Sequence, residues 1–224
     1  MTRLFPQPQL VLFDLDGTLA DTAADLAAPV NAMRAERGLP ALSAEQLRPF
    51  ASMGARGLIG KGLGIDPAHA DYAALREEFL RRYEQAMCVH TRLFDGMDQV
   101  LSKLELGNRQ WGVVSNKFER YVRQVLSELG LLARSAITVG GDTTPHSKPH
   151  PAPLLHAATL MAVDPARCIY VGDDLRDVEA GKAAGMITVA AAYGFCGDAI
   201  APREWGADAL IESPGELIAL LELA

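Results

Sequence analysis

The sequence is poor in cysteine, has no excess of basic charge and contains no long apolar run. Its 224 residues include three cysteines, which lie far apart and follow no zinc-binding spacing, so we expect free thiols and no disulfide framework. The net charge of -7 argues against a nucleic-acid partner, because a phosphate backbone attracts clustered Lys and Arg. The first residues lack the apolar core of a signal peptide, and no stretch reaches the length of a membrane span. We therefore expect a cytoplasmic protein with no membrane partner.

The distribution of apolar residues predicts strands that alternate with helices along most of the chain. Such alternation implies parallel strand pairing through right-handed crossover connections. We therefore expect the α/β fold class, with an open, mostly parallel, Rossmann-like sheet that carries helices on both faces. The predicted strands cover residues 9–13, 111–114, 136–139, 168–171, 187–191 and 209–211. Helices are predicted after residue 92 at 97–106, 118–129, 151–161, 175–184 and 214–223.

Between the first two predicted strands the pattern indicates helices and no convincing strand. Helical periodicity covers residues 21–37, 44–50 and about 66–87, and a glycine-rich stretch at 54–64 predicts a flexible loop between them. Because the strand before this block belongs to the same sheet as those after it, the block is interpreted as a small helical cap domain inserted after the first strand. The predicted division is a catalytic core of residues 1–19 and 92–224 and a cap of residues 20–91.

Acidic side chains follow the first predicted strand, at the edge of the sheet where open α/β folds bind ligands. The run from Asp14 to Thr18 could be a simple turn, since Asp-Gly is a common turn dipeptide. However, Asp14 and Asp16 are two carboxylates at the end of one buried strand, and they repel each other unless a cation or a shared proton is present. A hard, oxygen-seeking ion such as Mg²⁺ suits them.

Neutral and basic polar groups follow two of the later elements. Ser115 and Asn116 come directly after a strand, where they could cap the next helix or donate hydrogen bonds to phosphoryl oxygens. Lys148 lies in a loop punctuated by prolines, where it could be a solvated surface lysine or a compact cation directed at a phosphoryl group. Each of these signals is weak when it is taken alone.

A second acidic group follows the strand that ends at Val171. Asp173, Asp174 and Asp177 are three carboxylates within five residues, at a predicted helix start. Acidic residues favour a helix N-terminus because of the helix dipole, but three are more than a cap needs. The recurrence of reactive groups at four strand ends of one sheet is what favours an active site there.

Taken together, these motifs resemble those of the haloacid dehalogenase-type hydrolases. The Asp14-x-Asp16-Gly17-Thr18 run, Ser115, Lys148 and the Asp173 group match the four motifs of that family, and the helical insertion matches its cap. Within the family the chain resembles the phosphoglycolate phosphatase group. It is also similar to bacterial N-acetylmuramic acid 6-phosphate phosphatases, notably in residues 93–97, 111–114 and 172–177. One departure is Phe118, which stands where that group often has proline after the Asn-Lys pair.

The resemblance implies a Mg²⁺-dependent phosphatase that works through an aspartyl-phosphate. Asp14 would attack phosphorus, while Asp16 protonates the leaving alkoxide and later takes a proton from water. The implied Mg²⁺ ligands are Asp14, the backbone carbonyl of Asp16, and Asp173, with Asp177 or Asp174 acting through water or by orienting Lys148. The implied holders of the phosphoryl oxygens are Thr18, Ser115, Asn116 and Lys148.

Arg56, in the glycine-rich stretch of the cap, is the candidate for binding the part of the substrate beyond its phosphoryl group. It could bind a carboxylate bidentately, or it could be an ordinary exposed arginine in a loop. Phosphoglycolate and N-acetylmuramic acid 6-phosphate both carry a carboxylate. We therefore expect a small anionic phosphate ester, phosphoglycolate first and N-acetylmuramic acid 6-phosphate as the alternative, hydrolysed by a monomer or a homodimer.

Two other classes of protein share part of this chemistry. A receiver-type signalling domain also phosphorylates an aspartate, but Gly140-Gly141-Asp142 is a poor acceptor context and the cap has no place in that fold. A phosphosugar mutase on the same fold would need an acid/base group in its cap. No such group is identifiable in residues 20–90 from the sequence.

Overall fold

The computed structural model describes residues 8–197 and 200–223, and a parallel sheet forms its centre. Within these residues the main sheet has six strands in the order β5-β4-β1-β6-β7-β8, and every neighbouring pair is parallel. The predicted open, mostly parallel α/β sheet is therefore confirmed. The strands are β1 (Leu10–Phe13), β4 (Gln110–Val114), β5 (Thr138–Val139), β6 (Cys168–Gly172), β7 (Ile187–Ala191) and β8 (Ala209–Ile211).

Strand β1 lies in the middle of the sheet, between β4 and β6. Its last residue, Phe13, is in register with Val113 of β4 and with Val171 of β6. Parallel strands in this register end at the same edge of the sheet, so the residues that follow them are brought together. This topology places three of the four predicted motifs, those of Asp14, Ser115 and Asp173, at one edge of the sheet.

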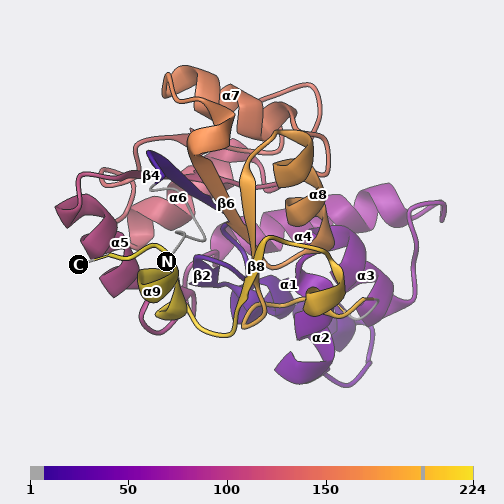
Figure 1. Cartoon of the computed structure of the whole chain (residues 1–224). Helices are drawn as coiled ribbons and strands as arrows, with labels where there is room; N and C mark the ends of the chain where they lie inside the picture. The colour runs from indigo at the N-terminus through magenta and orange to yellow at the C-terminus, as the bar shows by residue number, and fades with distance from the viewer. Residues whose placement is uncertain (1–7, 198–199, 224) are drawn as a thin grey trace.

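The two faces of the sheet bury different helices. Val11 and Phe13 of β1 belong to one apolar cluster, and Leu10 and Leu12 belong to another, because successive strand side chains point to opposite faces. Full burial of each such side chain contributes about 1.5–3 kcal/mol to the stability of the folded state. One face is covered by α5 (Met97–Leu106), α6 (Glu119–Glu128) and α9 (Glu216–Leu220), the other by α7 (Ala152–Leu160) and α8 (Leu175–Ala183) (Figure 1).

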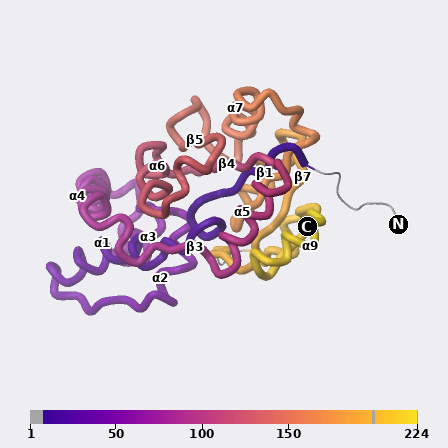
Figure 2. Tube along the Cα trace, turned by 90° about the vertical axis from the view of Figure 1, so that its left-hand side faces the viewer, coloured from indigo at the N-terminus to yellow at the C-terminus, as the bar shows by residue number. Residues whose placement is uncertain are grey.

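Four further helices lie between the short antiparallel strands β2 (Ala20–Asp21) and β3 (Arg92–Leu93). They gather at one end of the molecule, away from α7 and α9 (Figure 2). The predicted cap limits, 20–91, enclose them, and the division into domains stays a prediction. These helices, called the cap here, are α1 (Ala23–Glu36), α2 (Ala44–Ala51), α3 (Gly54–Leu63) and α4 (Tyr72–Gln85).

The glycine-rich stretch at 54–64 is helical, so the predicted flexible loop is wrong. A Cβ atom on Gly57 would collide with the backbone of Phe50, and one on Gly62 would overlap Val30 of α1. The glycines therefore allow α3 to pack tightly against α1 and α2, a reason that composition alone does not reveal. Gly64, with φ +69°, then ends the helix in the left-handed conformation.

Three smaller features complete the comparison with the predicted elements. The capping box of Ser43 and Gln46 at the start of α2 is present as expected. Helix α4 begins at Tyr72 rather than near Asp66, whose side chain instead accepts the amide of Ala68 in a turn. Two short 3₁₀ helices, Pro165–Arg167 and Pro202–Glu204, were not predicted. Among the described residues, no helix combines the length and the apolar character needed to cross a bilayer.

Candidate active site

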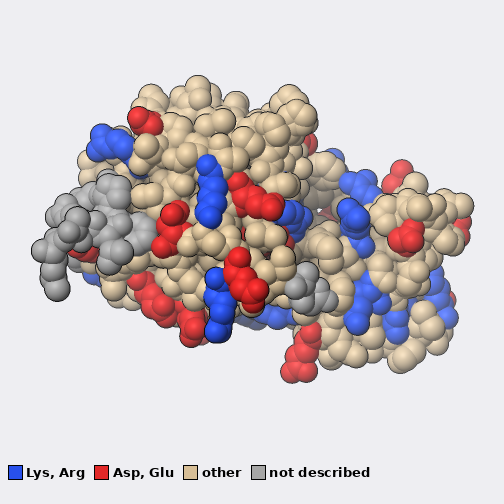
Figure 3. Space-filling view, turned by 45° about the vertical axis from the view of Figure 1, so that its right-hand side comes forward, with Lys and Arg blue, Asp and Glu red and all other residues tan. Residues whose placement is uncertain are grey.

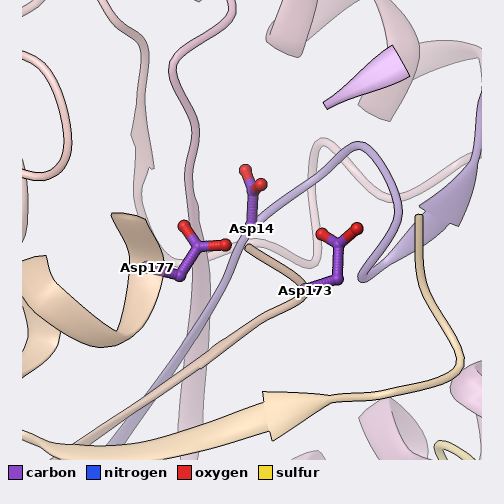
Figure 4. A group of neighbouring side chains, drawn as sticks. All are labelled: Asp14, Asp173 and Asp177. Atoms are coloured by element: carbon purple, nitrogen blue, oxygen red, sulfur yellow. The ribbon is translucent and has the colours of Figure 1, made fainter. Parts of the chain in front are cut away.

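Three carboxylates converge at the carboxyl edge of the sheet. Asp14 follows β1, Asp173 follows β6, and Asp177 lies in the first turn of α8 (Figure 4). One oxygen from each lies within 4.8 Å of the others. Asp173 and Asp177 are only 1% and 2% exposed. Burial and the neighbouring carboxylates of Asp14 and Asp177 raise the pKa of Asp173 well above its ordinary value.

The donor set fits a hard divalent cation. Oxygen ligands from several carboxylates are what Mg²⁺ and Ca²⁺ prefer, and a cation among them would remove the repulsion that raises the pKa of Asp173. Asp14, Asp173 and Asp177 are the groups that would hold the ion. The carboxylate of Asp16 lies outside this cluster, which agrees with the predicted use of its backbone carbonyl and does not test it.

Glycines make room for the buried carboxylates. Gly17 has φ +88°, and a Cβ atom there would overlap the carboxylate of Asp173. A Cβ atom on Gly172 would likewise overlap Asp177. The glycine of the first motif is therefore required both for its left-handed backbone and for the close approach of Asp173.

Lys148 supplies the central positive charge of the site. Its Nζ lies 3.0 Å from Asp14 Oδ1 and 2.7 Å from Asp177 Oδ1, and it donates to the hydroxyl of Tyr170 at 2.7 Å. Burial alone would lower the pKa of Lys148, but the carboxylates of Asp14 and Asp177 more than offset this and raise it. Lys148 is thus a buried, charged lysine, rather than a solvated surface residue.

Asp174 takes no part in the carboxylate cluster. It is the N-cap of α8, where its side chain accepts the amide of Arg176 at 3.0 Å and pairs with the guanidinium of the same residue at 2.7 Å. Asp177 instead contacts Lys148 and lies beside Asp14 and Asp173. Of the two candidates left open by the sequence, Asp177 is therefore the one that joins the carboxylate cluster, while Asp174 lines the cavity as the partner of Arg176.

Two of the predicted phosphoryl ligands have other partners in the structure. Thr18 is fully buried, and its hydroxyl donates to Asp173 Oδ1 at 2.9 Å, so the geometry favours a role in holding Asp173 over the predicted contact with substrate. The amide of Asn116 donates to the carbonyl of Lys148 and accepts its N–H, each at 2.9 Å, which fixes the Lys148 loop. Ser115 faces the open site, where its hydroxyl can donate to a ligand.

Lys117 is a site residue that the sequence analysis missed. Its Nζ lies 2.7 Å and 2.9 Å from the two carboxylate oxygens of Asp16, and the hydroxyl of Thr22 donates to Asp16 Oδ1 at 2.6 Å. Burial alone would lower the pKa of Lys117, but Asp16 more than offsets this and raises it. Its position directly after Ser115 and Asn116 at a strand end was the available signal.

A cavity of about 350 Å³ lies between the cap and the core. Its core residues include Asp14, Ser115 and Lys148, and its cap residues come largely from α3 and α4. The space-filling view shows a hollow between two lobes with Lys and Arg side chains on both sides (Figure 3). Arg56, in the first turn of α3, lines the cavity, and its predicted contact with substrate stays a prediction.

Known proteins are similar to this chain in sequence and in fold. Residues 11–191 match the family model of haloacid dehalogenase-like hydrolases. An N-acetylmuramic acid 6-phosphate phosphatase of Pseudomonas putida is 44% identical over 96% of either chain. A phosphoglycolate phosphatase of Xanthomonas campestris pv. campestris is 47% identical over 94% of this chain and 95% of its own. The chain therefore belongs to the haloacid dehalogenase-like hydrolases, as its motifs predict.

A solved structure agrees with this assignment. The crystal structure of a predicted phosphoglycolate phosphatase from Haemophilus somnus has a TM-score of 0.85 and 25% identity, and covers 96% of this chain and 98% of that one. Its fold therefore matches along nearly the whole length, including the helices between β2 and β3.

Proposed function

We propose that this enzyme is a Mg²⁺-dependent phosphatase that hydrolyses a small anionic phosphate monoester through an aspartyl-phosphate on Asp14. The class, a phosphoric monoester hydrolase, follows from the family and from relatives named as phosphatases. The observation that carries the mechanism is the group of three carboxylates with Lys148, which opens onto a cavity large enough for a small molecule.

Asp14 is the carboxylate placed to attack. Its side chain is 13% exposed and lines the cavity, whereas Asp173 and Asp177 are buried. The amide of Leu15 donates to Asp14 Oδ1 at 2.7 Å, and Lys148 lies 3.0 Å from the same oxygen, so the other oxygen is left to form the bond to phosphorus.

Asp16 is the proton carrier of the proposed mechanism. It gives a proton to the ester oxygen as that bond to phosphorus breaks, and regains one from the water that cleaves the aspartyl-phosphate. Lys117 and Thr22 hold its carboxylate at the cavity. The products are the free alcohol and inorganic phosphate, with Asp14 and Asp16 restored.

The remaining residues stabilise charge and hold the phosphoryl group. When bound, Mg²⁺ would neutralise part of the charge on the phosphoryl oxygens and on Asp14 and Asp173. Ser115 donates from the core side of the cavity, and Lys148 adds its positive charge beside Asp14. The side chain of Asn116 forms two hydrogen bonds with the backbone of Lys148 and so keeps Lys148 in place. Such positioning of a charged group matters for a loose transition state.

The substrate of this phosphatase is proposed to carry a carboxylate. The two similar enzymes are named for phosphoglycolate and for N-acetylmuramic acid 6-phosphate, and both compounds have one. Arg56 lines the cavity on the cap side, where a guanidinium can bind a carboxylate with two parallel hydrogen bonds. Phosphoglycolate is the first candidate from the sequence, and N-acetylmuramic acid 6-phosphate is the second.

The cap residues of the cavity favour hydrolysis over phosphoryl transfer within a sugar. A mutase needs an acid/base group on the cap, but the described cap residues that line the cavity include no Asp, Glu or His. Membership of the hydrolase family likewise argues against a receiver-type signalling domain.

The test is the Asp14→Asn variant. We expect it to lose release of phosphate from a generic ester such as p-nitrophenyl phosphate, and to show no phosphorylated enzyme after acid quenching and mass spectrometry. Asp95→Asn is the matched control, because Asp95 is exposed and makes no described contact. Retained turnover by a correctly folded Asp14→Asn enzyme would remove Asp14 as the nucleophile.

A further inference from the structure

Two arginines of the cap face the cavity without an acidic partner. Arg76 of α4 and Arg56 of α3 both line it, and among residues 8–197 and 200–223 neither forms an ion pair. The guanidinium carbon of Arg76 lies 5.9 Å from the centroid of the Phe118 ring, its one described contact. Arg48 and Arg82 of the same cap, by contrast, are paired with carboxylates.

The acidic residues that line the cavity are already occupied. They belong to the core, where Asp16 is bound by Lys117, Asp14 and Asp177 by Lys148, and Asp174 by Arg176. The unpaired positive charge of Arg56 and Arg76 therefore has no counterpart within the described part of the cavity. A site of this kind attracts an anion from solution, and a planar guanidinium favours a carboxylate.

Two buried hydroxyl groups point to a ligand with further polar atoms. Ser52 Oγ and Tyr83 Oη are buried and form no hydrogen bond of normal geometry among the described residues, although the ammonium of Lys117 interacts with the Tyr83 hydroxyl, and both residues line the cavity. Tyr83 is only 2% exposed, and burial raises the pKa of its hydroxyl to about 12, so it remains a donor. Leaving such a group unpaired is costly, and the cost is recovered when a ligand supplies the partner.

The position of these hydroxyl groups is set by contacts with the core. Arg176 of α8 donates to the carbonyl of Ser52 at 2.8 Å, and the ammonium of Lys117 lies 4.8 Å from the centroid of the Tyr83 ring. Ser52 and Tyr83 are therefore held at the boundary between cap and core, near the proposed phosphoryl site. Both residues line the cavity that Asp14 and Arg76 also line.

The remaining cavity wall is apolar and aromatic, and the space exceeds what a two-carbon ester fills. Phe79 and Leu80 of α4 face the cavity together with Phe118 and Tyr121 of the core. A volume of about 350 Å³ equals the share of about a dozen water molecules in the liquid, at about 30 Å³ each. Phosphoglycolate has only two carbons, whereas a sugar ring offers C–H faces to aromatic side chains and hydroxyls to polar ones.

From these observations we infer that Arg76, with Arg56, forms a carboxylate-binding site for a phosphorylated sugar acid larger than phosphoglycolate. Ser52 and Tyr83 bind the polar groups of its sugar body. This inference rests on the proposed function, since the phosphoryl group must sit at Asp14 for the carboxylate to reach the cap. It deepens that function by choosing the class of substrate, and it adds Arg76, Ser52 and Tyr83 as specificity residues.

The experiment compares substrates that differ in the carboxylate. N-acetylmuramic acid 6-phosphate and N-acetylglucosamine 6-phosphate share one sugar, and only the first carries the acidic lactyl group. We expect wild-type kcat/KM to be at least about tenfold higher for the acidic sugar than for N-acetylglucosamine 6-phosphate or for phosphoglycolate, because a hydrogen-bonded charge contributes that much or more.

The variant Arg76→Gln is expected to reduce the ratio of kcat/KM for the two sugars by about tenfold or more, mainly through KM for the acidic one. Tyr83→Phe keeps the ring and should lower kcat/KM for both sugars relative to kcat/KM for phosphoglycolate. Arg81→Gln is the matched control, since Arg81 lies on the same helix, is exposed and lies outside the cavity.

The outcomes separate the inference from the function on which it rests. If wild-type enzyme hydrolyses p-nitrophenyl phosphate but prefers phosphoglycolate to both sugars, the inference is overturned and the phosphatase proposal stands. An unchanged sugar ratio in folded Arg76→Gln also overturns it, and Arg56→Gln provides a second variant should the first be unstable. Release of phosphate from none of the esters would overturn both.

Discussion

The ammonium group of Lys117 lies 2.7 Å from Asp16 Oδ1 and 2.9 Å from Asp16 Oδ2, so one lysine spans the whole carboxylate. The same ammonium lies over the ring of Tyr83 in α4. Lys117 belongs to the core, and Tyr83 to the cap. The proposed proton carrier is thus held by a residue that contacts both parts of the molecule, which links its position to the position of the cap.

Loss of this ion pair should slow the reaction. We expect Lys117→Met to lower kcat by about tenfold to a hundredfold with a smaller change in KM, since a misplaced catalytic group costs rate in this range. Lys117→Arg should restore part of the rate because it keeps the charge. Steady-state kinetics measure kcat and KM of both variants. Lys103→Met is the control, because it removes a lysine of α5 whose side chain has no described partner. A kcat equal to that of wild type in folded Lys117→Met would show that Asp16 does not need this lysine.

Divalent cations should stabilise the fold through Asp173. An ion that binds only the folded state adds about 2.7 kcal/mol at a concentration of 100 times Kd, so Tm should rise on addition of MgCl₂. Burial and the neighbouring carboxylates raise the pKa of Asp173, so protons compete with the ion for its carboxylate more strongly than they would at an ordinary aspartate. Mg²⁺ binding is therefore expected to weaken as pH falls.

The variant Asp173→Asn removes one of three crowded carboxylates. We expect a metal-free Tm at least as high as that of wild type, because like-charge repulsion is relieved, and no rise with MgCl₂. Differential scanning calorimetry at several MgCl₂ concentrations measures both effects. Equal stabilisation of the two proteins by Mg²⁺ would place the ion elsewhere.

Gly17 should tolerate no side chain. Its φ of +88° costs a residue with a Cβ atom about 1–3 kcal/mol, and in Gly17→Ala the added methyl would also overlap the Asp173 carboxylate. Gly185→Ala is the matched control, because Gly185 has φ +74° but no atom within reach of a new Cβ. The difference in free energy of unfolding between the variants, measured with urea, isolates the contact. An equal loss of unfolding free energy in the two variants would mean that the Asp173 carboxylate moves away from the added methyl group without a cost in stability.

A substitution of Thr18 tests whether its hydroxyl holds Asp173 or binds the substrate. Thr18→Val keeps the shape and removes the hydrogen bond to Asp173, so we expect Mg²⁺ affinity to fall by about tenfold, as is typical when a partner of a metal ligand is lost. The KM for substrate at saturating Mg²⁺ should change little. Activity titrated against MgCl₂ separates the two effects. A raised KM with unchanged Mg²⁺ dependence would instead restore the role predicted from the sequence.

Local patterns were sufficient for the architecture and for the expectation that the main candidate site residues lie at one edge of the sheet. Apolar runs that end in polar residues located β1, β4 and β6, and parallel pairing then required Asp14, Ser115 and Asp173 to meet at one edge. The cap helices also followed from periodicity, except α3, whose glycines were interpreted as flexibility. That error arose because close packing against Val30 and Phe50 leaves no trace in the local sequence.

The sequence by itself therefore determined the parallel sheet, the inserted helices and the reactive strand ends, because strand and helix periodicity and parallel pairing act over short stretches. Only the tertiary structure decided which partner each polar group has. Lys117 and Asp16 are 101 residues apart, and Thr18 and Asp173 are 155 apart. Such pairs, and the cavity with its two unpaired arginines, depend on how the cap packs on the core. Neither periodicity nor motif spacing specifies that packing, because it is the sum of many contacts between distant segments.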